Sequence, residues 1–519
     1  MRKFARSGPV GRDRYYRIPP LTRINLDQVL TLISDEQYFV LHAPRQTGKT
    51  TTLLALRDLL NSGSEGDYRC VYASLEAGRT AGEDVERAMR IILGELGTQA
   101  RGTLGDGSVE DLGREALASA GPDRAVRVAL LRWAAADPRP LVLLLDEVDT
   151  LTGDPLLSLL SQLRSGYPDR PERFPQSVVL SGLRDLKDYR APGAKGIPFN
   201  IKAESLRLGD FSEAETRALL GQHTEETGQA FTEEAASAVW GETCGQPWLV
   251  NALAYEACFR TKAGRDRSRA ITEENVLDAR ERLIASRATH LDHLGSKLEE
   301  ERVRRVIEPL LSGGGRSEST ARDIEYVRDL GLIAVAPPVR IANPIYVEVI
   351  PRELSSTLQE ELAQETWWYV GPDGELRLEK LMQGFQQFFR EHSEHWAGRF
   401  DYHEAGPQLI LQGFLQRIVN GGGRLEREYG LGRRRTDLMI AWPRGEAMDR
   451  HAVECKVQHR GREATIREGL TQTAAYMDRL GAESGHLVIF DRNPERTWAD
   501  KIYRRDEDHE DRTITVWGM

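Results

Sequence analysis

The chain has 519 residues, of which 40% are hydrophobic and 29% charged, a balance typical of globular proteins and long enough for two or more domains. Its net charge of −10 excludes a polycation, so any contact with nucleic acid has to come from local basic patches. The four cysteines form no CxxC pair, which argues against a zinc ribbon or a disulfide framework and favours reduced thiols.

Residues 1–17 are basic, but no apolar segment follows them, so they lack the pattern of a secretory signal peptide. We interpret them as a flexible N-terminal arm. The sequence contains no apolar run long enough to cross a membrane. These features predict a cytoplasmic protein.

Residues 1–208 alternate short apolar runs with amphipathic, helix-like stretches. This alternation predicts an α/β core with a parallel sheet and helices on both faces. The run LVLLL at 141–145 is apolar at every position and fits a central strand that is buried on both sides. The expected strands lie at 38–43, 69–75, 141–147, 177–183 and 198–206.

The pattern changes after this core. Residues 209–290 have helical periodicity only and predict a helical lid. Residues 291–355 have the order helix, loop, helix and two short strands, VRIAN at 339–343 and IYVEVI at 345–350, which favours a winged helix. Residues 356–400 are polar and helix-like with several aromatics, and we expect them to form a helical connector.

The segment APRQTGKT at 43–50 follows a predicted strand and precedes a Leu-rich helix. This matches a phosphate-binding loop in which Ala43 replaces the usual first glycine. Gly48 would let the backbone approach a phosphate, Lys49 would reach the β- and γ-phosphates, and Thr50 would ligate Mg²⁺. The alternative, a tight turn with an exposed lysine, does not account for the strand–loop–helix order. The expected ATP contacts are Ala43, Pro44, Arg45, Gln46, Thr47, Gly48, Lys49, Thr50 and Thr51.

Two acids follow the apolar strand and would lie at the carboxyl edge of the sheet, where ligands bind in open α/β folds. We expect Asp146 to hold Mg²⁺ through water and Glu147 to polarise the attacking water. Capping of the next helix is the alternative, and for Asp149 we favour a capping or structural role. Ser181 ends the next strand and would sense the γ-phosphate. Arg184 would contact nucleotide, although a surface arginine fits the sequence equally well.

Residues 20–350 resemble the AAA-like P-loop ATPases, especially their archaeal-ATPase and STAND branch. The resemblance rests on APRQTGKT, LLLDEVD, SGLRD and CGQPWLV, the last of which resembles that branch's Gly-x-Pro motif at Gly245 and Pro247. It implies ATP and Mg²⁺ as ligands, and a lid and winged helix that fold over the nucleotide and switch with its state. The winged helix would pack within the chain or bind DNA, with packing slightly favoured. Assembly into a homo-oligomer is also implied.

A small α/β domain is expected at 401–519. It begins with an apolar helix and continues with a strand at 424–430. Two further strands, at 436–442 and 451–457, are predicted to be joined by the polar turn 443–450. A long amphipathic helix and another strand follow.

Alternation along 451–457 places Glu454 and Lys456 on one face of the strand and Cys455 on the other. Asp437 would meet Glu454 across the hairpin, bringing two carboxylates and an ammonium together. The two acids would hold Mg²⁺ or Mn²⁺, and Lys456 would orient water or stabilise negative charge during phosphodiester cleavage. A solvated sheet face is the alternative. We expect Cys455 to be a buried, inert thiol.

Neighbouring residues favour the metal site. A basic triplet precedes Asp437 and would contact DNA phosphates; it consists of Arg433, Arg434 and Arg435. The following helix places Gln472 and Tyr476 one turn apart on one face.

The order helix, three strands, helix and strand over 401–519 resembles the PD-(D/E)XK nuclease fold. Asp437, Glu454 and Lys456 match its D…ExK motif, and Gln472 and Tyr476 match the QxxxY motif of the recombination-exonuclease branch. That family also has an acid in its first helix, for which Glu404 is the candidate. A simple charge effect at the helix start competes with this role, and Gln408 or Gln412 are alternatives.

The leading hypothesis is therefore a Mg²⁺-dependent DNA nuclease coupled to an ATPase, in which the nucleotide state regulates cleavage. Such a fusion suits prokaryotic defence or mobile-element biology. The alternative is a nucleotide-switched DNA-binding or signalling scaffold without nuclease activity. A processive translocase is disfavoured because the sequence has no helicase-like motif set.

Overall fold

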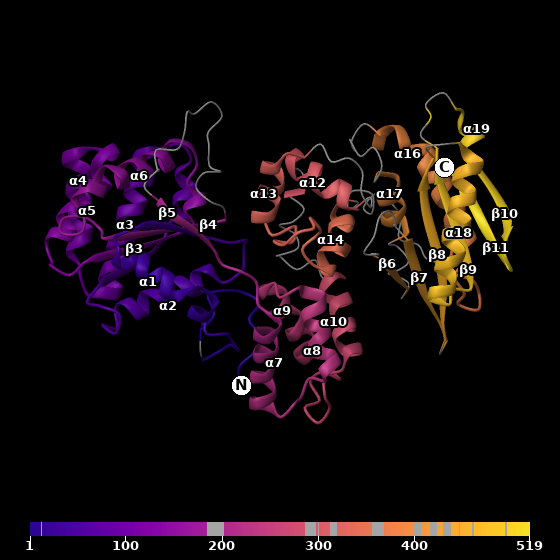
Figure 1. Cartoon of the computed structure of the whole chain (residues 1–519), viewed down its shortest axis with the longest axis horizontal. Helices are drawn as coiled ribbons and strands as arrows, with labels where there is room; N and C mark the ends of the chain where they lie inside the picture. Colours follow the sequence, from indigo (N-terminus) through magenta and orange to yellow (C-terminus); the bar gives the residue numbers. More distant parts are fainter. Residues whose placement is uncertain are drawn as a thin grey trace. The chain divides into compact units, whose positions relative to one another are not determined.

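The computed structural model divides the chain into two compact units, residues 1–286, 325–334 and 342–344 and residues 287–324, 335–341 and 345–519 (Figure 1). No helix in the described part of the chain is both long and apolar enough to span a membrane. The structure describes residues 1–11, 13–183, 202–285, 297–298, 300–311, 319–354, 368–397, 406–415, 423–428, 437–445, 447–458, 461–491, 493 and 496–519.

The first unit is built on a five-stranded sheet whose strands are all parallel, in the order β2-β3-β4-β1-β5. The α/β core with a parallel sheet predicted from the sequence is confirmed. Residues Leu141–Asp146 of β3 are buried at every position because helices cover both faces of the sheet. The strands are β1 (Tyr38–His42), β2 (Arg69–Ser74), β3 (Leu141–Asp146), β4 (Ser177–Gly182) and β5 (Lys202–Arg207).

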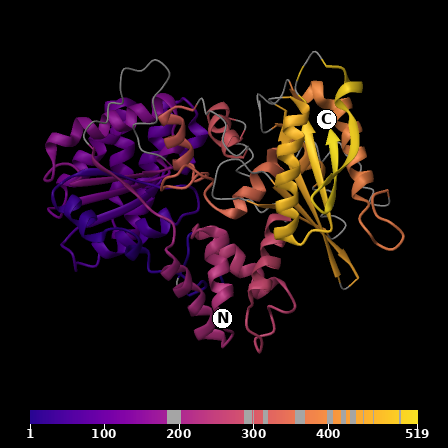
Figure 2. The same cartoon turned by 45° about the vertical axis from the view of Figure 1, so that its right-hand side comes forward.

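Helices cover both faces of this sheet (Figure 2), and a hydrophobic cluster lies on each face. Helices α1 (Leu26–Ser34) and α2 (Lys49–Leu60) pack on the face that carries Val142 and Leu144. The face that carries Leu143 is covered by a larger set of helices. These are α3 (Val85–Leu104), α4 (Ser108–Ala120), α5 (Pro122–Ala135) and α6 (Gly153–Gly166).

Between the end of β5 and Ala285 the regular elements are helices, in agreement with the helical periodicity of residues 209–290. The first of them, α7, begins with a capping box in which Ser212 and Glu215 exchange side-chain and backbone hydrogen bonds. The lid helices are α7 (Glu213–Thr227), α8 (Glu233–Thr243), α9 (Pro247–Tyr255) and α10 (Glu273–Ala285), with a short π-helix at Glu256–Arg260.

The N-terminal segment is not a free arm, so that interpretation was wrong. Phe4 and Tyr16 are each 1% exposed. Tyr16 shares a hydrogen bond of 3.2 Å with His223 of α7, and the backbone N of Ala5 donates to Asn251 of α9 at 3.1 Å. Charge and turn residues suggested mobility, but two buried aromatics attach the segment to the lid.

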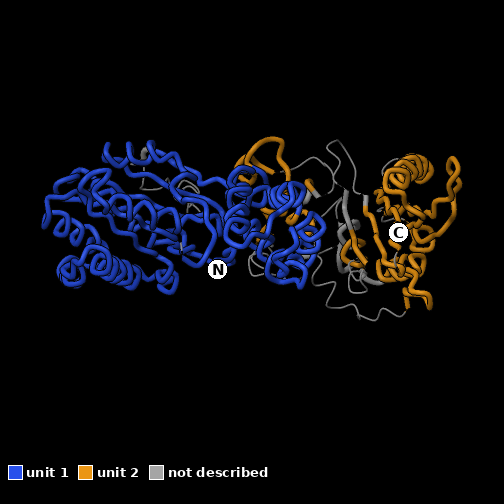
Figure 3. The backbone as a smooth tube through the Cα atoms, turned by 90° about the horizontal axis from the view of Figure 1, so that it is seen from below, with its two compact units in different colours: residues 1–286, 325–334, 342–344 blue, residues 287–324, 335–341, 345–519 orange. Residues whose placement is uncertain are grey.

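The segment after the lid contains α12 (Glu301–Leu311), α13 (Ala321–Asp329) and α14 (Pro344–Leu354). The strand predicted at 345–350 is wrong, because these residues belong to α14. Ile345, Tyr346, Val349 and Ile350 are buried at helical spacing, and Pro344 stands at the first helical position, where proline is favoured. Residues 339–343 also form no strand of the two sheets. Figure 3 shows how the two units divide this segment.

The second unit contains a six-stranded mixed sheet in the order β10-β11-β9-β8-β7-β6. β8 pairs antiparallel with β7 and parallel with β9. The predicted polar turn 443–450 was too long, because both strands of the hairpin extend into it. The strands are β6 (Arg424–Glu428), β7 (Asp437–Arg444), β8 (Ala447–Val457), β9 (Ser484–Phe490), β10 (Tyr503–His509) and β11 (Arg512–Gly518).

One face of this second sheet packs against α18 (Arg462–Leu480), and the other packs against α16 (Leu378–Ala397) and α17 (Gly406–Leu415). The aromatic side chains Tyr369 and Phe385 lie in the same hydrophobic cluster as the sheet. The interpretation of 356–400 as a connector between domains was therefore wrong for its described residues. Tyr369, Phe385 and Phe388 are core residues of the second unit.

Candidate nucleotide site and candidate metal centre

The loop between β1 and α2 has the backbone shape needed to surround a phosphate. Gly48 has φ +97°, and a Cβ at this position would lie 2.8 Å from Nη1 of Arg23. The left-handed backbone favours glycine, while the contact with the end of the flexible Arg23 side chain could be relieved by a small shift. The Thr47 hydroxyl donates to the carbonyl of Pro44 at 2.8 Å, which closes the loop on itself.

Lys49 lies inside this loop. Its Nζ donates to the carbonyls of Ala43 and Pro44 at 2.9 and 3.1 Å. Burial lowers the pKa of Lys49, while the negative charges of Glu147 and Asp146 oppose that effect. The lysine predicted to reach phosphate is thus a buried cation that donates to two backbone carbonyls of the loop.

Asp146 is fully buried at the end of β3. Its Oδ2 accepts hydrogen bonds from the Thr50 hydroxyl at 2.7 Å and the Tyr72 hydroxyl at 3.2 Å. Its Oδ1 accepts from the backbone N of Glu147 at 3.0 Å. The structure brings together Thr50 and Asp146, the two residues predicted to bind Mg²⁺, and adds Tyr72, which sequence reasoning missed.

Glu147 adopts a left-handed backbone with φ 55°, a conformation that non-glycine residues rarely take. Burial raises the pKa of its carboxyl; Lys49 lowers that pKa and Asp149 raises it further. Asp149 accepts a hydrogen bond from the backbone N of Leu183 at 3.3 Å, a contact between the ends of β3 and β4.

Ser181 is fully buried, and its hydroxyl has no hydrogen-bond partner within the described ranges. Arg184, its predicted companion, lies outside the residues that the structure describes.

A cavity of about 510 Å³ lies over the loop. Its walls include Gln46, Lys49, Thr50, Asp146 and Glu147, as predicted from the motifs. Sequence reasoning missed the walls contributed by the N-terminal segment and the lid, because no short motif marks them. Those residues include Gly8, Pro9, Val10, Arg23, Trp248 and Asn251.

The lid motif has a steric explanation. Gly245 has φ +78°, and a Cβ there would lie 1.9 Å from the carbonyl oxygen of Phe211. The backbone N of Phe211 donates to the Gly245 carbonyl at 2.8 Å. Pro247 starts α9, and the Trp248 indole donates to the carbonyl of Arg6 at 2.9 Å. The motif therefore attaches the start of α9 to the segment that enters the lid after β5 and to the N-terminal segment.

Residues 32–189 match the family model of the AAA domain. The first unit contains an AAA-type P-loop ATPase domain. Such a domain implies ATP binding, usually with Mg²⁺, and the cavity over the P-loop is the candidate ATP site. The oxygen donors of Thr50 and Asp146 fit that hard cation.

Solved structures that match this chain include the Walker-type ATPase of Pyrococcus abyssi, at 13% identity and a TM-score of 0.44, with 67% of this chain and 98% of that chain covered. ORC2 of Aeropyrum pernix has 13% identity and a TM-score of 0.41, covering 64% and 93%. RuvB of Thermotoga maritima has 15% identity and a TM-score of 0.33, covering 65% and 95%. Such low values carry no function from these proteins to this chain. No curated protein matches the sequence.

The second candidate site lies on the face of the mixed sheet that α18 covers. The Glu454 side chain is fully buried and stands opposite Asp437 in the β7–β8 register. Lys456 Nζ lies 2.9 Å from Glu454 Oε1 and donates to Gln472 Oε1 of α18. Tyr476, one turn further along α18, is fully buried.

Glu454 is an unusual buried carboxylate. Neither of its oxygens accepts a hydrogen bond of good geometry from the part of the chain described, and the ion pair with Lys456 provides the nearby positive charge. A buried anion with so few donors favours a cation beside it. An oxygen donor of this kind suits Mg²⁺ or Mn²⁺.

Several predicted residues of this site cannot be placed with it. The basic triplet Arg433–Arg435 and Glu404 lie outside the described residues, and only the backbone of Asp437 is described. Gln412 is buried on α17, the helix on the opposite face of the sheet. Among the described side chains, no group of three or more His, Cys, Asp or Glu could hold a metal ion.

Cys455 lies on the opposite face from Glu454, in the cluster that α16 and α17 cover. It is 4% exposed and forms no disulfide. This position leaves the thiol in the hydrophobic core.

Proposed function

We propose that this AAA-type ATPase carries a Mg²⁺-dependent DNA nuclease in its second unit, and that the nucleotide state of the first unit regulates cleavage. The observation that carries the proposal is the buried Glu454 carboxylate. It is paired with Lys456, stands opposite Asp437 and connects through Lys456 to Gln472.

In this proposal Asp437 and Glu454 hold the metal. When bound, Mg²⁺ supplies a water of lowered pKa and offsets negative charge on the phosphodiester. Lys456 orients that water or donates to the scissile phosphate, because its ammonium is held between Glu454 and Gln472. The buried ring of Tyr476 packs α18 against the sheet and so keeps Gln472, one turn away, in place. Arg433, Arg434 and Arg435 neutralise the DNA backbone beside the site.

The ATPase half works through the residues over the P-loop. Lys49 and the loop backbone bind the ATP phosphates, Thr50 and Asp146 hold Mg²⁺, and Glu147 accepts the proton of the attacking water. Burial raises the pKa of the Glu147 carboxyl, which makes it a stronger proton acceptor than an exposed carboxylate. Ser181 senses the γ-phosphate, and Arg184 contacts the nucleotide. We also propose that the chain assembles into a homo-oligomer and acts in prokaryotic defence or mobile-element biology.

The full chain should be incubated with circular and linear DNA, and with RNA, over a Mg²⁺ series with and without ATP. We expect DNA cleavage by the wild type and its loss in Asp437→Ala and Lys456→Ala. Cys455→Ala is the matched control, because this neighbour lies on the opposite face of β8. Cleavage of RNA alone would correct the substrate class.

A second candidate function is a nucleotide-switched scaffold that binds DNA without cutting it. It would be supported if the wild type bound DNA but cut no form of it at any Mg²⁺ or ATP concentration. A Glu147→Gln variant with unchanged cleavage would show instead that the two halves act independently.

A further inference from the structure

Tyr72 stands in β2, beside the strand that carries Asp146. Its ring belongs to the hydrophobic cluster that contains Leu144 and Leu53, and only 9% of the residue is exposed. Its hydroxyl reaches the wall of the ATP cavity and lies 3.2 Å from Asp146 Oδ2. A buried tyrosine hydroxyl is retained where it has a partner, and here that partner is the acid predicted to hold Mg²⁺.

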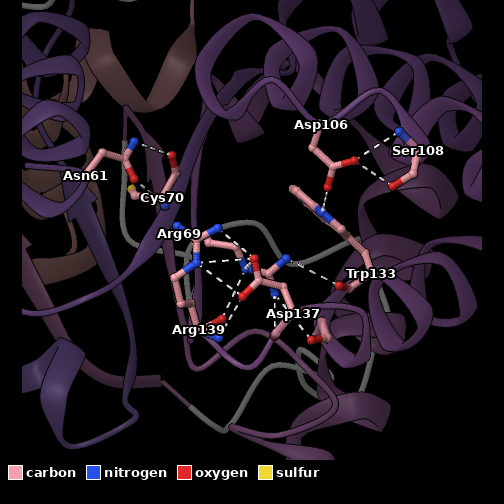
Figure 4. Close-up of polar contacts among 9 residues, drawn as sticks. Asn61, Arg69, Cys70, Asp106, Ser108, Trp133, Asp137 and Arg139 are labelled. Carbon is pink, nitrogen blue, oxygen red and sulfur yellow. Dashed lines mark hydrogen bonds and ion pairs between the residues drawn. The ribbon is translucent and has the colours of Figure 1, made fainter. Parts of the chain in front are cut away.

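The strand that carries Tyr72 is fixed at its other end (Figure 4). The Arg69 guanidinium donates to the carbonyls of Ala134, Asp137 and Arg139 at 3.2, 3.1 and 3.1 Å. The backbone N of Cys70 donates to Asn61 at 2.8 Å. Because β2 is attached at its start and packed along its length, the Tyr72 hydroxyl has little freedom to leave Asp146.

The three donors to Asp146 have different origins. Thr50 belongs to the P-loop helix, and the Glu147 backbone follows Asp146 directly, so both lie among residues that face the nucleotide. Tyr72 approaches the shared Oδ2 atom from the neighbouring strand.

We infer that Tyr72 is a positioning residue that holds the Asp146 carboxylate in the orientation needed for Mg²⁺ at the ATP site. It contacts neither phosphate nor metal in this role and acts through Asp146. Residues of this kind, which orient a ligand of the metal, change metal affinity by about 10- to 100-fold when they are removed. A purely structural hydroxyl would change stability without changing the Mg²⁺ requirement.

The test is a titration of the full chain with a fluorescent ATP analogue, first in EDTA and then over a Mg²⁺ series. In Tyr72→Phe we expect the Kd in EDTA to stay within about twofold of the wild type. We expect the Mg²⁺ concentration that gives half-maximal tightening to rise by about tenfold. Tyr38→Phe is the matched control, because Tyr38 is a buried tyrosine of the same sheet whose hydroxyl donates to the Pro175 carbonyl at 2.9 Å.

Equal Mg²⁺ midpoints for Tyr72→Phe and Tyr38→Phe would overturn the inference. So would a loss of binding in EDTA as large as the loss in Mg²⁺, because that result indicates a general defect of the pocket. Tyr72→Leu provides a second variant without the hydroxyl, and a thermal melt in EDTA checks folding. Should either Tyr72 variant melt at the wild-type temperature with an unchanged Mg²⁺ midpoint, Tyr72 has no positioning role.

Discussion

Asp146 of the ATP site and Glu454 of the second sheet are both fully buried strand carboxylates, yet their surroundings differ. Asp146 accepts three hydrogen bonds, from two hydroxyls and one backbone N. Glu454 has an ion pair with Lys456, but no hydrogen bond of good geometry within the described residues. Fixed donors orient a carboxylate before a ligand arrives, whereas a carboxylate balanced by a single ammonium depends on the cations around it. The first site is therefore preorganised, and the second should respond to added metal.

The largest effect is expected at the preorganised site. Glu147→Gln should lower ATP turnover by about 1000-fold, because an amide cannot accept a proton from water. ATP binding should be kept, since Asp146 is held by the backbone N of residue 147, which the change leaves in place. Turnover and Kd should be measured together. Glu76→Gln, another acid-to-amide change in the cavity wall, is the control, and equal turnover in both variants would remove Glu147 from the role of base.

The substitution Lys456→Ala should show most clearly, through the free energy of unfolding, how the site at Glu454 differs from the site at Asp146. Removing the ammonium leaves the buried Glu454 charge unpaired, which should cost about 3 kcal/mol in free energy of unfolding in EDTA. Millimolar Mg²⁺ should restore part of that loss if the metal binds beside Glu454. Denaturant melts with and without Mg²⁺ measure both effects. Lys380→Ala, an exposed lysine of α16, is the control, and equal melts for the two variants would contradict the comparison.

Lys49→Ala should weaken ATP binding by at least about 100-fold, equivalent to about 2.7 kcal/mol. The cation lies within the P-loop on the Ala43 and Pro44 carbonyls, where a phosphate would replace those partners. Equilibrium titration with ATP gives the Kd. Arg57→Ala removes another cation from the same helix and should leave the Kd unchanged. A similar loss in both variants would mean that general positive charge, and not the P-loop lysine, binds ATP.

The smallest effect is a loss of stability at acid pH, caused by His486 on the face of the second sheet opposite Glu454. The Trp517 indole donates to His486 Nδ1 at 3.1 Å, and His486 Nε2 lies 3.1 Å from the Ser484 hydroxyl. Burial lowers the pKa of His486 to about 3, so the unfolded chain binds a proton more readily. The free energy of unfolding is therefore highest above about pH 6.5, where His486 is neutral in both states. It decreases as the pH falls, by roughly 2 kcal/mol at pH 5.

Denaturant melts followed by tryptophan fluorescence at pH 7 and pH 5 measure this loss, and His486→Gln should reduce it. His509→Gln, on the partly exposed end of β10, is the matched control. If His486→Gln leaves the difference between pH 7 and pH 5 unchanged, proton binding by His486 does not explain the acid sensitivity.

The sequence was most informative where chemistry depends on contiguous residues. A loop of backbone N–H groups and a strand ending in acids are local patterns, so the parallel sheet and the ATPase domain could be predicted. IYVEVI misled because β-branched residues favour strands, while burial of Ile345 and Val349 one turn apart favours the observed helix. Tyr72 looked like an ordinary core residue of an apolar strand. Its contact with Asp146 depends on which strands are neighbours, and no short motif records that. The metal centre of the second sheet stays a prediction.

The N-terminal segment also determines when the wall of the cavity can form while the chain is being synthesised. Residues 2–17 bond to Glu226, Gln222 and Asn251, and the backbone N of Val10 donates to Thr51 beside the P-loop. A growing chain therefore carries these early residues without all of their lid partners until α9 has left the ribosome. The wall of the ATP cavity can be completed only then, although the P-loop itself emerges some two hundred residues earlier.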